Sequence, residues 1–336
     1  MTLRLGESRL ASRETLLFES VSRKGRKDSL RRKSRRTVPI KIGTAPVSWG
    51  IMEVEGWGGQ KDYREMLDEM AEAGYEGTEL GPYGYLPADP ERLISELSSR
   101  GLRLVSAFVP VALAEPERHE SSFREVMKVA ELLAKSAARL IVLADEMREA
   151  RMAVAGRVIE DRDGMRDPGW DSAVSILTRV ALACRELGLA TTFHHHAGTY
   201  IETPKEIERL CASTDPGLIG LCLDTGHYFY GGGDPVKAVE KYGSRIWHVH
   251  LKDVRPDVLG SVRREGLNFL DAVRRGVFCE LGEGAVDFPA LEQRLLNCAY
   301  DGWAIVEQDV DTTQPGVRPF ESALRSRQYL RHALGT

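Results

Sequence analysis

From residue 39 to its end, the chain alternates between short apolar runs and segments in which apolar residues recur every three or four positions. The runs are rich in β-branched residues, as buried strands are, and the periodic segments have the spacing of amphipathic helices. The pattern predicts eight strands, at residues 40–49, 77–80, 103–110, 139–145, 190–196, 219–224, 246–254 and 303–310. It predicts helices between them, at residues 61–73, 90–100, 122–138, 171–187, 204–212, 235–242 and 289–298, and a last helix at residues 320–334.

Eight successive strand–helix units predict an α/β fold, a (β/α)₈ or TIM barrel, which typically takes about 250 residues. The excess length lies in two excursions, residues 146–170 and 256–287, each of which follows a predicted strand. Such barrels place substrate-covering loops at that end of their strands. An open doubly wound sheet is the alternative, but it requires a GxGxxG or GxxxxGK[ST] motif, and the chain has neither.

The start of the chain differs in charge from the rest. Residues 1–36 hold 12 Lys and Arg against 4 Asp and Glu, whereas the remaining residues hold 34 against 46. We therefore expect a basic, disordered arm at residues 1–38, or translated upstream sequence, followed by a single barrel domain at residues 39–336. A tether to nucleic acid or an anionic surface is the alternative for the arm. The acidic body argues against a nucleic-acid partner for the domain.

The composition is also informative about the class of protein to which the chain belongs. A hydrophobic share of 42% with 29% charged residues is typical of a globular domain with a sizeable core. No apolar run reaches the length of about 18 residues that a membrane span needs, so we expect no membrane partner. The five cysteines are scattered without CxxC spacing, which indicates free thiols in a reducing cytoplasm.

The segment at residues 246–254 carries the most unusual side chains. Trp247, Val249 and Leu251 alternate with His248, His250 and Lys252, so that a strand here has one apolar face and one face of imidazoles and an amine. Six of the chain's eight histidines lie in three short segments, of which this is one. This clustering is the main indication of function.

Together with this seventh strand, the fifth, sixth and eighth make four consecutive predicted strands that end in polar residues. The fifth ends in His194, His195 and His196, the sixth in Asp224 with His227 behind it, and the eighth carries Glu307. In a barrel these ends meet at one mouth, where catalytic residues lie. Imidazoles with carboxylates and no cysteine suit Mn²⁺, Co²⁺, Zn²⁺ or Fe²⁺ rather than a structural zinc.

Each residue also has a purely structural interpretation. His195 should face away from its two neighbours, Asp224 could cap the following turn, and Lys252 could extend to solvent. Glu79, at the end of the second strand, could bind substrate or form an ion pair. A structural role is hardest to accept for His250 and Glu307, because burying unpaired titratable groups costs several kcal/mol.

The motifs resemble those of the xylose-isomerase-like barrels, the superfamily of sugar isomerases, epimerases and endonuclease IV, and are most similar to the inosose dehydratase family. The resemblance covers residue 39 to the C-terminus, and its motifs together are specific. They are Gly43–Gly50 (GTAPVSWG), Gly77–Pro87 (GTELGPYGYLP), His194–Thr199 (HHHAGT), Asp224–His227 (DTGH), His248–Asp253 (HVHLKD) and Val306–Glu307.

The resemblance implies a divalent metal, Mn²⁺ or Co²⁺ before Zn²⁺ or Mg²⁺, at the strand ends. Asp224, His250 and Glu307 match three of the four ligands of related enzymes. The fourth, a glutamate in the family, falls on His194 here, with a shift onto His196 as the alternative. His227 matches a substrate-contacting histidine, and we expect three further substrate contacts, from His196, Trp49 and Tyr83.

The His194 substitution bears on the reaction that the resemblance implies. Family epimerases use a glutamate on each face of the substrate, and this chain lacks the strand-five glutamate, so a dehydratase (hydro-lyase) acting on a small keto-inositol is favoured. The candidates for its proton carriers are Lys252, His248, His227 and Glu79. A neighbouring dication would lower the pKa of Lys252 and suit it as a base.

Three other functions remain as alternatives. A sugar or hydroxypyruvate isomerase or epimerase would use the same barrel. A DNA-repair endonuclease would need a larger ligand set and a basic body, and a sugar sensor without turnover would not need intact Asp224, His250 and Glu307. The sequence leaves the oligomeric state open, and a homo-oligomer is possible.

Overall fold

The structure is a computed structural model that describes residues 40–52 and 61–335. The predicted basic arm at residues 1–38 lies outside the described residues, so that prediction stays open. In the described part, nine strands form one parallel sheet in the order β3-β2-β1-β11-β8-β7-β6-β5-β4. These strands are β1 (Lys41–Thr44), β2 (Gly77–Thr78), β3 (Arg103–Leu104), β4 (Phe108–Val111), β5 (Leu140–Asp145), β6 (Ala190–His194), β7 (Ile219–Asp224), β8 (Ile246–Leu251) and β11 (Trp303–Val306).

The two ends of this strand order, β3 and β4, belong to one predicted strand. β3 pairs with β2, and β4 pairs with β5. Between them, Ser106 accepts a hydrogen bond from Leu80 of the β2 side, and Ala107 accepts one from Val142 of β5. The third strand therefore closes the sheet into a cylinder, and the predicted (β/α)₈ barrel is confirmed.

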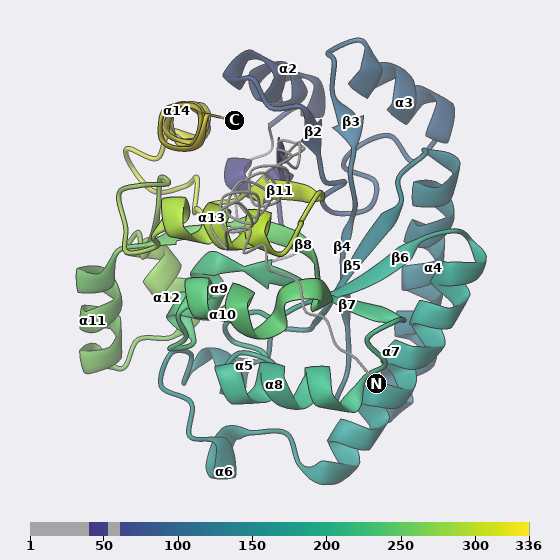
Figure 1. Ribbon diagram of the computed structural model, residues 1–336, viewed down its shortest axis with the longest axis vertical. Coiled ribbons are helices and arrows are strands. Elements are labelled where there is room, and N and C mark those ends of the chain that lie inside the picture. Colours follow the sequence, from purple (N-terminus) through teal and green to yellow (C-terminus); the bar gives the residue numbers. More distant parts are fainter. Residues whose placement is uncertain (1–39, 53–60, 336) are drawn as a thin grey trace, which may run out of the picture. The chain divides into compact units, whose positions relative to one another are not determined.

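Helices surround the sheet (Figure 1). The eight predicted ones appear within a few residues of their expected limits, and the third and fourth begin earlier than the sequence indicated. They are α2 (Tyr63–Ala73), α3 (Pro90–Ser98), α4 (His119–Lys135), α7 (Asp167–Glu186), α8 (Pro204–Ser213), α10 (Pro235–Tyr242), α13 (Phe288–Asn297) and α14 (Pro319–Leu334). Asp89, Thr203 and Asp234 cap α3, α8 and α10 with their side chains, each before a proline in the first turn.

Several predicted strands are shorter than expected. The first ends at Thr44, and the 3-10 helix η1 (Pro46–Trp49) follows, because proline cannot donate to the ladder and favours a helical first turn. The segment at residues 246–254 is broken after β8, and its last part, β9 (Asp253–Val254), pairs antiparallel with β10 (Phe278–Cys279). The fifth and eighth strands likewise end early, at His194 and Val306.

The two excursions contain helices of their own. The first holds α5 (Glu149–Met152) and α6 (Glu160–Asp163), and the second holds α11 (Pro256–Glu265) and α12 (Phe269–Arg274). Residues of both excursions form a hydrophobic cluster separate from the main core, together with Ala197 in the loop after β6, Tyr230 of α9 (Thr225–Tyr230) and Val254 of β9. We call this unit the cap. Its own core makes it a distinct layer of packing beside the barrel.

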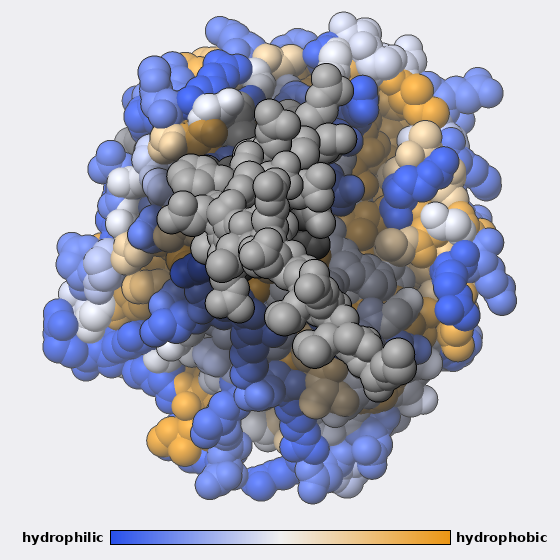
Figure 2. Space-filling view, in the orientation of Figure 1, coloured by the Kyte–Doolittle hydropathy of each residue, from blue (hydrophilic) through white to orange (hydrophobic). Residues whose placement is uncertain are grey.

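Figure 2 shows hydrophilic side chains over much of the visible rim, with smaller hydrophobic areas between them. Within the described residues, no helix is long and apolar enough to cross a membrane.

Candidate active site

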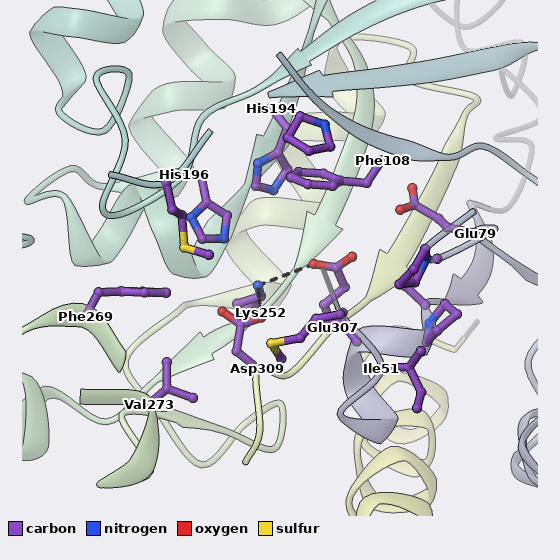
Figure 3. Close-up of a pocket in the computed structure, with 18 of the residues that line it drawn as sticks. Ile51, Glu79, Phe108, His194, His196, Lys252, Phe269, Val273, Glu307 and Asp309 are labelled. Carbon is purple, nitrogen blue, oxygen red and sulfur yellow. Dashed lines mark hydrogen bonds and ion pairs between the residues drawn. The ribbon is translucent and has the colours of Figure 1, made fainter. Parts of the chain in front are cut away.

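A cavity of about 490 Å³ lies at the carboxyl ends of the barrel strands. Its polar side chains come from residues at or just beyond the ends of β2, β5, β6, β8 and β11. Figure 3 shows Lys252, Glu307 and Asp309 close together, with His194, His196 and Glu79 around them. As predicted, these strand ends therefore meet at one mouth of the barrel.

Four of the predicted ligands form a compact group. The donor atoms of His194, Asp224, His250 and Glu307 all lie within 4.8 Å of one another, and all four side chains are buried. His194 Nε2 lies 3.4 Å from Asp224 Oδ2. His250 Nδ1 lies 3.2 Å from Glu307 Oε2 and 3.9 Å from Asp224 Oδ2. The structure thus groups His194, rather than His196, with the other three.

The donor set fits a divalent metal ion. Ligands about 2.1 Å from one ion are separated by about 3.0 to 3.4 Å in octahedral or tetrahedral geometry, close to the distances found here. His250 Nδ1 is buried without a hydrogen-bond partner, while His250 Nε2 lies 3.1 Å from Glu79 Oε1. An imidazole that donates from Nε2 to a carboxylate keeps its Nδ1 lone pair for a metal.

The two oxygens of Asp224 have different roles. Oδ1 accepts a hydrogen bond of 2.7 Å from the backbone N–H of His227 and caps α9. Oδ2 faces His194, His250 and Lys252 instead. The capping interpretation and the ligand interpretation are therefore compatible, because each uses one oxygen.

Lys252 is buried among carboxylates. Its ammonium lies 2.6 Å from Asp309 Oδ1, 3.3 Å from Glu307 Oε2 and 3.5 Å from Asp224 Oδ2. Burial by itself would lower the pKa of Lys252, but these carboxylates outweigh burial and raise the pKa well above its usual range. The lowered pKa expected beside a bound dication stays a prediction, because these contacts are those of the protein alone. The alternative in which Lys252 extends to solvent is wrong, since the side chain is buried.

Glu79 is the acceptor of three side chains. His248 Nε2, His250 Nε2 and the Ser106 hydroxyl lie 2.9, 3.1 and 2.7 Å from its Oε1. Burial would raise the pKa of Glu79, but His250 and His248 outweigh it and hold the pKa well below its usual range. Glu79 is an ionised carboxylate on the cavity wall.

His196 and His227 lie side by side, and His227 is next to Lys252. The rings of His196 and His227 are 3.8 Å apart, and burial lowers the pKa of both well below the usual range, so both are neutral. The backbone N–H of Ala197 lies 3.3 Å from His227 Nδ1. His227 Nε2 lies 3.0 Å from Lys252 Nζ and 3.5 Å from Asp309 Oδ2.

The remaining candidates lie farther from the cavity. His195 faces away from it, accepts the N–H of Asp224 at Nε2, and has a pKa that burial lowers to about 3. His248 is buried behind Glu79.

Two predicted substrate contacts are not brought to the cavity. Trp49 is 1% exposed and donates to Glu69 of α2, because η1 turns its side chain into the core. Tyr83 is 39% exposed and packs against Lys128 of α4. Contrary to the prediction, neither Trp49 nor Tyr83 lines the cavity.

Sequence reasoning missed other residues that the structure brings to the cavity. Asp309 is two residues past Glu307, and the same alternation that selected His250 and Lys252 would have selected it. Asp145 ends β5, and burial raises its pKa to about 6. The apolar lining from Phe108 and from the cap had no local signal.

Comparisons with known proteins agree in fold and in family. The family described as "Xylose isomerase-like TIM barrel" matches residues 67–332. A protein of Geobacillus kaustophilus (strain HTA426) named inosose dehydratase is 39% identical over 295 residues, which cover 87% of this chain and 94% of the relative. The inosose dehydratase of Lacticaseibacillus casei (strain BL23) is 33% identical over 293 residues, which cover 87% and 96%.

Solved structures show the same architecture at lower identity. An L-ribulose 3-epimerase superposes with a TM-score of 0.64 at 16% identity, over 88% of this chain and 95% of the other. A probable 3-DHS dehydratase from Bacillus anthracis gives a TM-score of 0.62 at 16% identity, over 87% and 98%. At this identity the likeness establishes the fold alone.

Proposed function

The chain belongs to the xylose isomerase-like TIM barrel family and, within it, to the inosose dehydratase family, and from this premise we propose that it is a hydro-lyase. Its substrate is inosose, 2-keto-myo-inositol, and the product is a trihydroxycyclohexane dione in inositol catabolism. Four relatives named inosose dehydratase, which are 33% to 39% identical to this chain, support this reaction.

One observation carries the proposal. His194, Asp224, His250 and Glu307 bring their donor atoms together beside the cavity, which His194 and Glu307 line, next to the buried ammonium of Lys252. A ketone with neighbouring hydroxyls presents oxygen atoms that suit this side of the cavity. The arrangement offers a Lewis-acid site and a proton donor within one small volume.

These four residues would hold the divalent metal, for which Mn²⁺ or Co²⁺ suits mixed imidazole and carboxylate donors. When bound, the metal polarises the ketone and so acidifies the adjacent C–H bond. Glu79 keeps His250 oriented through Oε1, because the imidazole lies within hydrogen-bond distance of that oxygen.

Glu79 is our proposed general base. All three of its hydrogen-bonding neighbours approach Oε1, and Oε2 has no hydrogen-bond partner among the described residues. A carboxylate that is ionised and lines the cavity can accept the proton from the carbon beside the ketone. His248 orients this carboxylate from behind.

Lys252 is our proposed general acid. Its contact with Asp309 holds it as an ammonium, and His227 lies beside it. Donation of its proton lets the hydroxyl one carbon farther from the ketone leave as water. The electron pair of the broken C–H bond forms the new carbon–carbon double bond, and the resulting enol rearranges to the dione.

The proposed function is tested by incubating the metal-loaded protein with 2-keto-myo-inositol in deuterated water and following product by NMR and mass spectrometry. Loss of one water with formation of the dione supports the dehydratase. Deuterium incorporation or epimer formation without loss of water would support the isomerase or epimerase alternative instead. A cytoplasmic location, a homo-oligomer and the absence of nucleic-acid or membrane partners remain predictions.

A further inference from the structure

His195 is a buried histidine to which the proposed mechanism gives no role. It directly follows β6, its side chain is fully buried, and it does not line the cavity. His194 and His196 on either side of it do line the cavity, as alternation along an extended chain requires. The imidazole of His195 is therefore a polar group in the core that cannot reach a ligand in the cavity.

The two ring nitrogens of His195 have different surroundings. Nε2 lies 3.3 Å from the backbone nitrogen of Asp224 and accepts its N–H. A ring nitrogen that accepts a hydrogen bond carries no proton, so in the neutral imidazole the proton is on Nδ1. Among the described residues, Nδ1 has no hydrogen-bond partner. The ring packs edge-to-face with Tyr228 of α9, with 5.5 Å between the ring centroids.

A histidine at this position is unfavourable for the fold taken alone. A buried N–H without an acceptor lowers stability, because it has lost its hydrogen bonds to water. A leucine would fill a similar volume without such a group, but it could not accept the N–H of Asp224. The contribution of His195 that an apolar residue could not replace is therefore its hydrogen bond to Asp224.

Asp224 lies where the chain changes direction. It is the last residue of β7 and also the N-cap of α9. The pairing of β6 with β7 ends at His194 and Cys222, two residues before Asp224. The ring of His195 extends the connection between the two strands as far as Asp224 by one side-chain hydrogen bond.

The position of this backbone decides where the carboxylate of Asp224 points. Its Oδ1 accepts the N–H of His227 at 2.7 Å, and its Oδ2 lies 3.4 Å from Nε2 of His194. A shift of the Asp224 backbone would move Oδ2 away from the other candidate metal ligands. Groups that hold a metal ligand in place commonly contribute ten-fold or more to metal affinity.

We propose that His195 is a positioning residue, whose Nε2 fixes the backbone of Asp224 and thereby directs Oδ2 toward the metal position. The neighbours His194 and His195 then serve one site in different ways, since His194 provides a donor atom and His195 orients the ligand on the adjacent strand. The inference rests on the ligand assignment in the proposed function, and it does not depend on which reaction is catalysed.

Two amide variants test the inference. In His195→Gln the amide reaches the position of Nε2 and can accept the Asp224 N–H, whereas in His195→Asn it reaches only the position of Nδ1. Competition with a chelator measures the affinity for Co²⁺, and the visible absorption spectrum of the Co²⁺-loaded protein reports the arrangement of the ligands. We expect His195→Asn to weaken Co²⁺ binding about ten-fold and to change the spectrum, while His195→Gln stays near the wild type.

His195→Leu separates positioning from a role in stability. It exchanges one buried N–H without an acceptor, that of Nδ1, for another, that of Asp224. Urea unfolding of the metal-free protein should therefore change little, while Co²⁺ affinity falls as in His195→Asn. Thr191→Val is the control, because Thr191 is buried on the same face of β6, and it should bind Co²⁺ as the wild type does.

Wild-type Co²⁺ affinity in both His195→Asn and His195→Leu would overturn the inference. Equal losses of affinity in His195→Asn and His195→Gln, or a large loss of stability in metal-free His195→Leu, would overturn it as well, because each indicates a role in core packing alone. The expected pattern of Co²⁺ affinities without dehydration of 2-keto-myo-inositol would reject the proposed dehydratase alone. Metal-dependent dehydration with unchanged Co²⁺ affinity in the variants would reject the inference alone.

Discussion

Lys252 Nζ lies 2.6 Å from Asp309 Oδ1, and this pair joins the strand that carries His250 to the segment that follows Glu307. Asp309 also faces His227 across a distance of 3.5 Å. The carboxylate of Asp309 therefore fixes the position of the Lys252 ammonium between the candidate metal ligands and the adjacent rings of His196 and His227.

Replacing Asp309 tests the role of this contact. Asp309→Asn keeps a hydrogen-bond acceptor for Lys252 but removes the charge, so we expect kcat to fall about ten- to hundred-fold with unchanged metal content. Steady-state kinetics and elemental analysis measure the two quantities. Asp301→Asn, at an exposed carboxylate before β11, is the control. A wild-type kcat in Asp309→Asn would contradict the role proposed for Lys252.

The ligand assignment predicts a specific loss of metal affinity. Glu307→Gln removes a negatively charged donor from the group with His194, Asp224 and His250, so we expect affinity for Mn²⁺ or Co²⁺ to fall at least about ten-fold. Competition with a chelator measures this affinity directly. Glu283→Gln, at an exposed glutamate, should bind metal as the wild type does. Unchanged affinity in Glu307→Gln would rule that residue out as a ligand.

Gly226 leaves room for the Lys252 side chain. A Cβ at Gly226 would lie 2.6 Å from Lys252 Cγ and 2.8 Å from its Cβ, so alanine must displace the lysine stem. Misplacement of a reacting group by about 1 Å costs on the order of a hundred-fold, and we expect kcat of Gly226→Ala to fall by about that factor. Gly217→Ala, where the new Cβ meets only an ordinary contact at 3.4 Å, is the control. Full activity of Gly226→Ala would contradict the position assigned to Lys252.

Glu202 should make stability depend on pH. It accepts hydrogen bonds from the N–H groups of Gly156 and Gly198, which connects the first excursion to the loop after β6. Burial raises the pKa of Glu202 to about 7 from 4.5, with Arg151 lowering it and Glu206 raising it. Between these values the folded protein binds more protons than the unfolded chain, so this contribution to stability is present at low pH and is lost as pH rises.

Urea unfolding of the wild type and Glu202→Gln at pH 5 and pH 8 measures the effect. The difference in unfolding free energy between the two proteins should fall by roughly 2 to 3 kcal/mol from pH 5 to pH 8. The comparison with Gln removes the titration of other groups, since both proteins share them. Glu186→Gln, at an exposed position on α7, should show no such change. A constant difference would mean that Glu202 titrates near its ordinary pKa.

The parts of the fold and site that could be predicted are those with a local pattern. Alternation within residues 246–254 selected His250 and Lys252, and apolar runs located β5, β7 and β8 to within a residue or two at their starts. Strand ends of a barrel converge, so the sequence alone predicts that Asp224 and Glu307 lie beside His250.

Other features depend on contacts between distant segments. Nothing near Trp49 indicates that η1 turns its indole toward Glu69, a contact that depends on the packing of α2. The pKa of Lys252 is set by three carboxylates on two other strand ends, which sequence order does not bring together. The apolar lining from the cap likewise requires the cap to fold against its own separate core.

The most direct test of the central claim is turnover of 2-keto-myo-inositol as metal is returned to the stripped protein. Dione absorbance is followed while Mn²⁺ or Co²⁺ is added in known ratio to the chain. We expect no turnover without metal and a rate that rises until about one equivalent is bound, as one four-donor site requires. Full turnover by the stripped protein, or no dione at any metal concentration, would contradict the assignment of this barrel as a metal-dependent dehydratase.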